Sequence, residues 1–289
     1  MQETKEIWAL LHLLDEPDED NYVHIAQKII TYGKDIIPNL ENIWENTQNN
    51  QIQDRIERLI HSVQFSDLQA DLQEWKNGPY HDLLFGCLLL AKYPYPDLAI
   101  TPIIQQLERL KRSIWLELNN YLTPLEQANV MHHSLFKTYG LQGKPVSYTQ
   151  VDDFLLHKAL SSKKGNVFAN GILYLVMADL LDIPVKAIPI PRQFILAFFK
   201  PSYQLCGPHD NLEAHISFFV DANSGEAYSH ADIATYLQRI GLKHQPQYFI
   251  PYTNQQILAV LLKEMAKCFQ SPNVQYKQAE LLALAEMFA

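Results

Sequence analysis

Apolar residues recur at helical spacing through the first part of the chain, with polar or proline-containing breaks at short intervals. Four segments carry this period: residues 5–14, 22–33, 36–47 and 52–63. A 3.6-residue apolar period predicts helices with one buried face. The chain therefore begins, on this pattern, as a series of short amphipathic helices.

Two interpretations explain this series equally well. Short helices joined by acidic or polar turns are typical of HEAT-type helical hairpins, in which each hairpin buries one face on its neighbour. An irregular helical cap on the following domain gives the same pattern. Both predict that this part of the chain offers a surface and not a reaction site.

The helical pattern continues to residue 121. Residues 66–76 are amphipathic, residues 82–93 are apolar on almost all sides, and residues 102–121 carry their charges on one side. A helix that is apolar all round is usually buried. Cys87 belongs to this apolar segment, so we expect it to be a core residue.

Thr123 opens the next helix with a strong start signal. Pro124 takes the first helical position and Glu126 the third, as in a capping box. Gly140 stands where a left-handed cap ends a helix. His132 and His133 are adjacent in this helix and point about 100° apart, so they cannot share a metal ion, and one of them is expected to be buried and the other exposed.

The pattern changes after residue 150. We expect a short helix over residues 153–164, capped by Asp152 or Asp153, and a long apolar helix over residues 167–181. Segments rich in β-branched and aromatic residues then predict strands. These segments are residues 185–191, 193–199 and 215–221.

Helices return at the end of the chain. Ser229 caps a helix, and residues 254–268 and 273–289 form a helical pair joined at Ser271-Pro272, similar to a single tetratricopeptide unit. The expected class is α+β: a HEAT-like helical region, a core with a small antiparallel sheet, and a helical tail. We place these three parts at residues 1–122, 123–245 and 246–289.

Composition and charge limit the kinds of partner that the chain is expected to bind. The chain has 289 residues, of which 47% are hydrophobic, and a formal net charge of −9. Its densest basic group is Arg109, Lys111 and Arg112 on an amphipathic helix, so we expect no nucleic-acid partner. No apolar run reaches about 18 residues and the N-terminus lacks a signal-peptide pattern, so no membrane association is expected. Three scattered cysteines favour a reducing cytoplasm.

Residues 165–224 have the layout of a papain-like or transglutaminase-like core. A loop, a long apolar helix and two extended segments follow one another there. In such cores the helix start presents a cysteine, and the strands present a histidine base and a residue that orients it. The helix start lowers the pKa of the cysteine through its dipole.

Six segments together resemble one bacterial family, the SirB-type transglutaminase-like proteins. They are residues 13–46, 132–166, 171–188, 191–199, 218–229 and 240–265. Among them, PRQFILAFF is similar to the family's P-x-H-F-[IL] strand, and FFVDANSGEAYS to its D-P-F-x-x-G strand and turn. The resemblance implies a helical N-terminal region, a degenerate transglutaminase-like core and a helical tail.

The resemblance also implies which positions would carry the relay. The nucleophile position, counted back from Asp182-Ile183-Pro184, falls on Val167, and the histidine position falls on Gln193. The orienting position falls on Asp221. With neither thiol nor imidazole, the carboxylate supports no proton relay, and loss of a triad nucleophile costs on the order of 10⁶ in rate.

Neighbouring residues offer weaker alternatives. Asn166 and Asn170 lie at the helix start, where an asparagine usually caps the helix. Cys206 lies in a loop with no helix start to stabilise a thiolate. The loop residues His209, Asp210, Glu213 and His215 form an H-D-x-x-E-x-H cluster, but polar loops collect such residues without a metal. We expect no metal and no cofactor.

The leading hypothesis is a non-catalytic transglutaminase-like protein that works by binding. Its partner would be a peptide or protein, held near Val167, Gln193 and Asp221 or on the N-terminal helices. The competing hypothesis is a cysteine- or metal-dependent hydrolase or transferase with a rearranged site, which requires a Cys, His or Ser side chain within hydrogen-bond reach of Asp221. A third is a structural subunit with an exposed apolar patch on its helical arm. The oligomeric state stays open.

Overall fold

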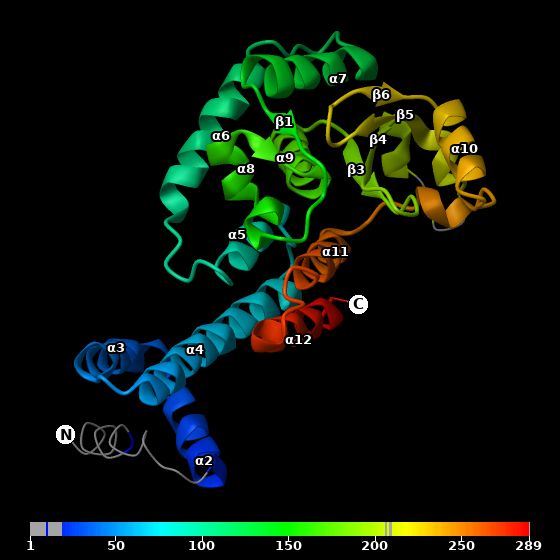
Figure 1. The fold of residues 1–289 in the computed structure, drawn as a ribbon. Helices are drawn as coiled ribbons and strands as arrows, with labels where there is room; N and C mark the ends of the chain where they lie inside the picture. The colour runs from blue at the N-terminus through cyan, green and yellow to red at the C-terminus, as the bar shows by residue number, and fades with distance from the viewer. Residues whose placement is uncertain (1–9, 11–18, 206, 208–209, 289) are drawn as a thin grey trace. The chain divides into compact units, whose positions relative to one another are not determined.

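The computed structural model describes residues 10, 19–205, 207 and 210–288. The chain divides into two compact units, one formed by residues 1–78 and 92–96 and the other by residues 79–91 and 97–289. The predicted helix at residues 5–14 falls almost entirely outside the described residues. Each unit has its own architecture (Figure 1).

The first unit is helical. It contains α2 (Glu19–Ile30), a 3-10 turn (Gly33–Ile36), α3 (Ile37–Asn46) and α4 (Asn50–Asn77). Six apolar side chains from these elements form its buried cluster: Ile29, Ile36, Leu40, Ile56, Leu59 and Val63. The amphipathic spacing in the sequence thus becomes one packed core, as expected for helices that each bury one face.

One prediction in this unit was wrong. The separate helices at residues 52–63 and 66–76 are a single helix, α4, of 28 residues. The residues between them, Gln64 and Phe65, include neither glycine nor proline, so nothing stops the helix. Polar character alone does not break a helix that continues to bury Leu68 and Leu72.

The second unit is mixed. Its helices are α5 (Leu83–Ala91), α6 (Ile100–Trp115), α7 (Pro124–His132), α8 (Leu156–Ser162), α9 (Val167–Leu180), α10 (His230–Arg239), α11 (Asn254–Ala266) and α12 (Gln275–Glu286). Its strands are β1 (Gln142–Gly143), β2 (Lys164–Gly165), β3 (Val185–Ile188), β4 (Ile195–Phe199), β5 (Ile216–Asp221) and β6 (Ala227–Tyr228). The predicted α+β class is confirmed.

The main sheet is antiparallel and small, as predicted. Its strand order is β3-β4-β5-β6, so each strand pairs with its neighbour in sequence. Ile195 at the start of β4 pairs with Asp221 at the end of β5. A separate parallel pair joins β1 to β2, with Gly143 opposite Gly165, and it lies partly in a segment predicted as loop.

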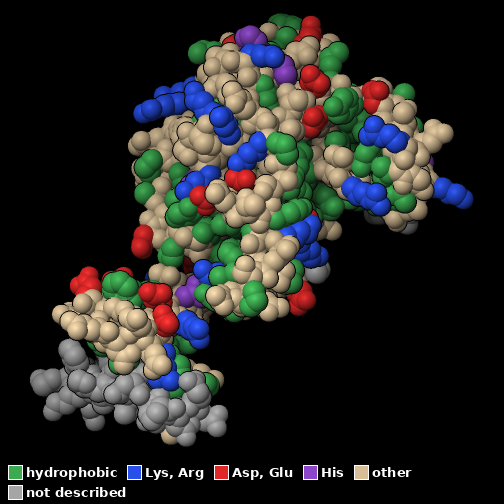
Figure 2. Space-filling model, in the orientation of Figure 1, with side chains coloured by type: hydrophobic (Ala, Val, Ile, Leu, Met, Phe, Trp, Pro, Cys, Tyr) green, Lys and Arg blue, Asp and Glu red, His purple; other side chains and the backbone are tan. Residues whose placement is uncertain are grey.

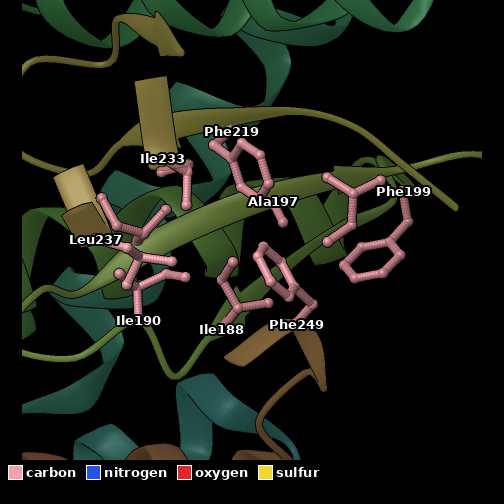
Figure 3. Close-up of a cluster of buried hydrophobic side chains, with 10 residues drawn as sticks. Ile188, Ile190, Ala197, Phe199, Phe219, Ile233, Leu237 and Phe249 are labelled. Atoms are coloured by element: carbon pink, nitrogen blue, oxygen red, sulfur yellow. The ribbon is translucent and has the colours of Figure 1, made fainter. Parts of the chain in front are cut away.

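The two faces of the sheet are covered by different helices. Ile195, Ala197 and Phe199 of β4 belong to a buried cluster that includes Ile233 and Leu237 of α10, most of which Figure 3 labels. Successive residues of a strand point to opposite faces. The face opposite α10 is covered by the apolar helix α9, and Figure 1 shows these two helices on either side of the sheet.

The helix after Thr123 starts as predicted and ends differently. Thr123 and Glu126 form the expected capping box. The helix then widens into a π-helical turn, His133–Thr138, and Gly140 follows with the predicted positive φ of 81°. His132 is half-buried and His133 is exposed, so the expected contrast between them is partly met.

Two further predictions were wrong in detail. The helix predicted to reach residue 121 is α6, which ends at Trp115. Neither Asp152 nor Asp153 caps α8, because a 3-10 turn (Val151–Phe154) precedes the helix and Leu155 takes the cap position without a side-chain bond. The two carboxylates instead pair with Lys158 and Lys144.

The predicted three-part division stays a prediction. In the structure α5 and α6 belong to the second unit, together with the sheet. The tail does form a helical hairpin, in which α11 packs on α12 after a turn at Pro272–Val274. The HEAT-like and tetratricopeptide-like assignments stay predictions as well.

Candidate functional site

Asn166 positions the start of α9. Its Oδ1 accepts hydrogen bonds from the backbone N–H groups of Phe168 and Ala169, at 3.0 and 3.1 Å. The side chain is fully buried, so this N-cap replaces water for two helix-end donors. Val167, the residue at the predicted nucleophile position, is half-buried and opens the helix.

Asn170 lies one turn further along α9 and is also buried. Its Nδ2 donates to the Gln142 carbonyl at 3.3 Å. A Cβ atom at Gly165 would lie 2.2 Å from its Oδ1, so only glycine fits there. Side-chain atoms of both asparagines, Asn166 Nδ2 and Asn170 Oδ1, are buried without a hydrogen-bond partner among the described residues. The helix start is thus packed tightly against β1 and β2.

Phe194, not Gln193, faces this helix start. The rings of Phe168 and Phe194 lie 5.3 Å apart, and a Cβ atom at Gly171 would lie 2.7 Å from the Phe194 ring. Gln193 and Asp221 lie with Ile195 on the α10 side of the sheet. The structure therefore brings Gln193 and Asp221 together and leaves Val167, Asn166 and Asn170 on the opposite side.

Gln193 and Asp221 line a cavity of about 270 Å³ between the sheet and α10. The lining residues are Ile190, Gln193, Ile195, Asp221, Tyr228, Asp232, Ile233, Tyr236 and Arg239. Isoleucines form its floor and polar groups its rim. The Tyr236 hydroxyl donates to the Pro191 carbonyl at 2.9 Å, which fixes one wall. An apolar floor with a few convergent polar groups is the usual form of a small binding site.

Asp221 holds the turn between β5 and β6. Its carboxylate accepts from the Asn223 backbone N–H and from the Ser224 hydroxyl, each at 2.9 Å. Ser224 is thus a hydroxyl within reach of Asp221, as the competing hypothesis requires. It lies three residues along the same turn and also accepts from the Glu226 N–H at 3.3 Å. A serine bonded directly to a carboxylate, with no imidazole between them, lacks the base that activates it.

The described thiols are poor nucleophiles. Burial raises the pKa of Cys87 well above its usual range, with a smaller contribution from Asp82. Burial, together with the Asp153 and Glu264 carboxylates, raises the pKa of Cys268 to about 11. The thiolate is the reactive form, so both are mostly unreactive at neutral pH. Cys206 lies outside the described residues.

The predicted loop cluster does not assemble as a metal site in the described part of the chain. No group of three His, Cys, Asp or Glu residues there is placed to hold a metal ion. Glu213 pairs instead with His244 at 2.9 Å, and His215 Nδ1 lies 3.0 Å from the Ser202 hydroxyl. His209 lies outside the described residues.

Four polar cavity residues were missed from the sequence: Tyr228, Asp232, Tyr236 and Arg239. Asp232, Tyr236 and Arg239 stand at i, i+4 and i+7, which places them on one side of α10. That spacing could have shown from the sequence that these three residues share one surface. Tyr228 is harder to find, because it lies in a two-residue strand. Burial raises the pKa of Tyr228, and the Asp221, Glu226 and Asp232 carboxylates raise it further.

Comparison with known families agrees with this fold. The model described as Transglutaminase-like superfamily matches residues 101–263, which is more than half of the chain. The chain belongs to the transglutaminase-like superfamily. The match runs from α6 to α11 and so includes the helix, the sheet and both sides described above. The predicted transglutaminase-like core is confirmed at the level of the superfamily.

Two curated relatives agree with the resemblance to SirB-type members of the superfamily. They are "Protein SirB1" of Salmonella typhimurium (strain LT2) and "Protein SirB1" of Salmonella typhi. Each is 26% identical over 123 residues, which cover 43% of this chain and 45% of the relative. The chain therefore spans less than half of the length of these relatives.

Two further searches gave negative results. No solved structure matches the chain. Within the described residues, no helix is both long enough and apolar enough to cross a membrane.

Proposed function

We propose that this chain is a non-catalytic member of the transglutaminase-like superfamily that binds a peptide segment of a partner protein. The observation that carries the proposal is the residue at the start of α9, where the resemblance places the nucleophile. It is Val167, which has no nucleophilic atom. Phe194 packs against this helix, so no base faces the start of α9 from that position.

The cavity beside Asp221 is the binding surface in this proposal. Tyr228 and Tyr236 present aromatic rings with hydroxyl groups, and Ile190 and Ile233 present apolar surface. Tyrosines bury large area at low entropic cost and are common in peptide-binding surfaces. The carboxylates of Asp221 and Asp232 outnumber the one cation of the lining, Arg239, so the preferred peptide carries a basic side chain next to an apolar one. A cytoplasmic location is part of the same proposal.

A matched pair of variants tests the proposal. Gln193 is exposed and lines the cavity, so Gln193→Trp fills the entrance without removing a buried group. Gln238 is an exposed residue of α10 outside the cavity lining, and Gln238→Trp is the control. Peptides selected from a random library on the wild-type protein should lose binding to Gln193→Trp and keep it with Gln238→Trp.

The same preparation tests the competing hypothesis. We expect no hydrolysis and no transamidation of peptides above the uncatalysed rate. Peptide cleavage that disappears in Cys206→Ala would overturn the non-catalytic proposal. If the selected peptides bind both tryptophan variants equally but fail with Trp44→Ala, the binding surface is the helical first unit, where Trp44 is exposed on α3.

A further inference from the structure

A second cavity, of about 370 Å³, lies between α6, the π-helical turn and the end of α8. It shares no lining residue with the cavity beside Asp221. Two of its lining residues are cations, Arg109 and Lys163, and no carboxylate occurs among the described residues that line it. The local charge favours an anion.

One wall of this cavity is formed by residues from the same side of α6. Gln106, Arg109 and Ser113 stand at i, i+3 and i+7 on α6, which places them on one side of the helix. Arg109 makes no ion pair with any described residue and is exposed. Figure 2 shows Lys and Arg side chains gathered over the flank of the molecule along which α6 runs. One member of the basic cluster seen in the sequence, Arg109, thus borders a cavity.

Lys163 supplies the second cation from a strained position. It follows α8 with φ of 56°, in the left-handed region where glycine is the ordinary residue. Its ammonium lies 5.0 Å from the centre of the Tyr139 ring, a cation–π contact that holds the charge at the cavity. Lys163 is the C-cap of α8, so the left-handed backbone ends the helix there while the side chain supplies charge at the cavity.

Uncharged donors complete the lining. The Ser134 side chain is only 3% exposed, and its buried hydroxyl has no hydrogen-bond partner among the described residues. A buried hydroxyl without a partner is costly unless a ligand satisfies it. Hydrogen bonds tie the α6 wall to the residues facing it: Gln106 Nε2 donates to the Tyr139 hydroxyl at 2.7 Å, and that hydroxyl donates to the Leu160 carbonyl at 2.7 Å.

The π-helical turn explains why Ser134 lies there. An α-helix that widens by one residue shifts the side chains that follow, and such turns are frequent at functional sites. Here the widened turn carries Ser134 and Thr138 at the cavity, and Tyr139 follows directly after it. Phosphate oxygens suit this set, since they accept from arginine, lysine and hydroxyl groups at once.

We propose that this cavity binds the phosphate group of a small phosphorylated molecule, with Arg109 and Lys163 as its cations and the Ser134 hydroxyl as a buried donor. This goes beyond the peptide-binding function and does not depend on it. The same phosphate chemistry is offered by free phosphate and by a phosphate ester. The test separates these two sources.

Isothermal titration calorimetry of the whole chain is the test, with inorganic phosphate and glycerol phosphate as probes and sodium chloride at equal ionic strength as the background. Arg109→Ala removes one cation, and Lys163→Asn removes the other while tolerating the left-handed backbone. Arg112→Ala is the matched control, since Arg112 is an exposed arginine of the same helix outside the cavity lining. We expect a loss of roughly tenfold in affinity for each of the first two variants and none for the control.

Ser134→Ala gives an independent readout. Removing an unpaired buried hydroxyl should raise the thermal midpoint of the free protein and reduce the increase in midpoint that phosphate produces. Tighter binding of glycerol phosphate identifies an ester as the ligand class, and tighter binding of inorganic phosphate identifies the free anion. No binding at millimolar concentration, or equal binding by Arg109→Ala and Arg112→Ala, overturns the proposal.

Discussion

Gly225 is required by both its backbone and its surroundings. It has φ of 74°, and a Cβ atom there would lie 2.4 Å from the Phe136 ring and 2.9 Å from His132 Nδ1. Gly225→Ala should therefore lower the free energy of unfolding by about 2–5 kcal/mol, the sum of left-handed strain and overpacking. Urea denaturation measures this.

Gly241 separates the two causes. It has the same φ of 74° but no atom within 4 Å of a built Cβ. Gly241→Ala should cost only the strain, about 1 kcal/mol. Equal costs at the two glycines would mean that the contact with Phe136 contributes nothing. Phe136→Leu in the Gly225→Ala background should restore part of the loss if the contact matters.

The reactivity of Cys268 gives a pH-dependent prediction. Its pKa is raised to about 11, first by burial and then by Asp153 and Glu264. The thiolate fraction at pH 8 is then about one hundredth of that of a thiol with the ordinary pKa. Alkylation by iodoacetamide, followed by mass spectrometry of the Cys268 peptide, should be slow and rise about tenfold per pH unit up to pH 11.

The unfolded protein is the control for this measurement. In concentrated urea the burial is lost, and the alkylation rate of Cys268 should level off near its ordinary pKa of 9.0. A folded protein that already levels off near that value would show that the thiol is open to water. Cys206 is followed on its own peptide in the same samples.

At the scale of single elements, helix starts were the most predictable feature. Thr123 with Glu126, and Ser229 before α10, each form the capping box that their spacing predicts. These signals are local, since the side chain bonds to a backbone group three residues away. The prediction at α8 failed because Asp152 and Asp153 look like caps but bind lysine side chains instead, Lys158 of α8 itself and Lys144 before the 3-10 turn.

Asn166 allows a test of what a buried cap contributes. Asn166→Ala leaves the N–H groups of Phe168 and Ala169 buried without partners, so the loss in unfolding free energy should be about 2 kcal/mol. Asn49 caps α4 through the Gln51 N–H on the exposed surface. Asn49→Ala exposes its donor to water and should cost about 0.5–1 kcal/mol.

Chemical denaturation of both variants decides the point. Asn166→Ser keeps a side-chain acceptor and should lie between the wild type and Asn166→Ala. Losses of the same size at positions 166 and 49 would show that burial adds nothing to the cap.

Across the whole molecule, the order of helices and strands could be predicted from the sequence. The face of the sheet on which each side chain lies could not. The helix at residues 167–181 and the strands that follow it are read from local periodicity. Which residue of the Gln193-Phe194 pair faces α9 depends on a single step of strand alternation, set by packing against Phe168 and Gly171. Because of this alternation, Val167 lies on the α9 side of the sheet, and Gln193 and Asp221 lie on the α10 side.

The two units provide the last prediction. Each has its own buried cluster: Leu40 lies in the first, and Leu196 of β4 is buried in the sheet of the second, both at 0% exposure. Leu40→Ala should lower the local free energy of opening of α2 to α4 by about 2–5 kcal/mol. Amide hydrogen exchange should show this loss there, with the protection of β4 and β5 unchanged.

Leu196→Ala is the reciprocal variant. It should reduce protection in β3 to β6 and leave the amides of α2 to α4 as they are, since a cavity destabilises the cluster that contains it. The chain passes between the units at residues 78–79, 91–92 and 96–97, so separate opening requires that these crossings carry little stability. If Leu40→Ala lowers exchange protection equally in both units, they unfold as one, and ligand effects at either cavity must then be measured on the stability of the whole chain.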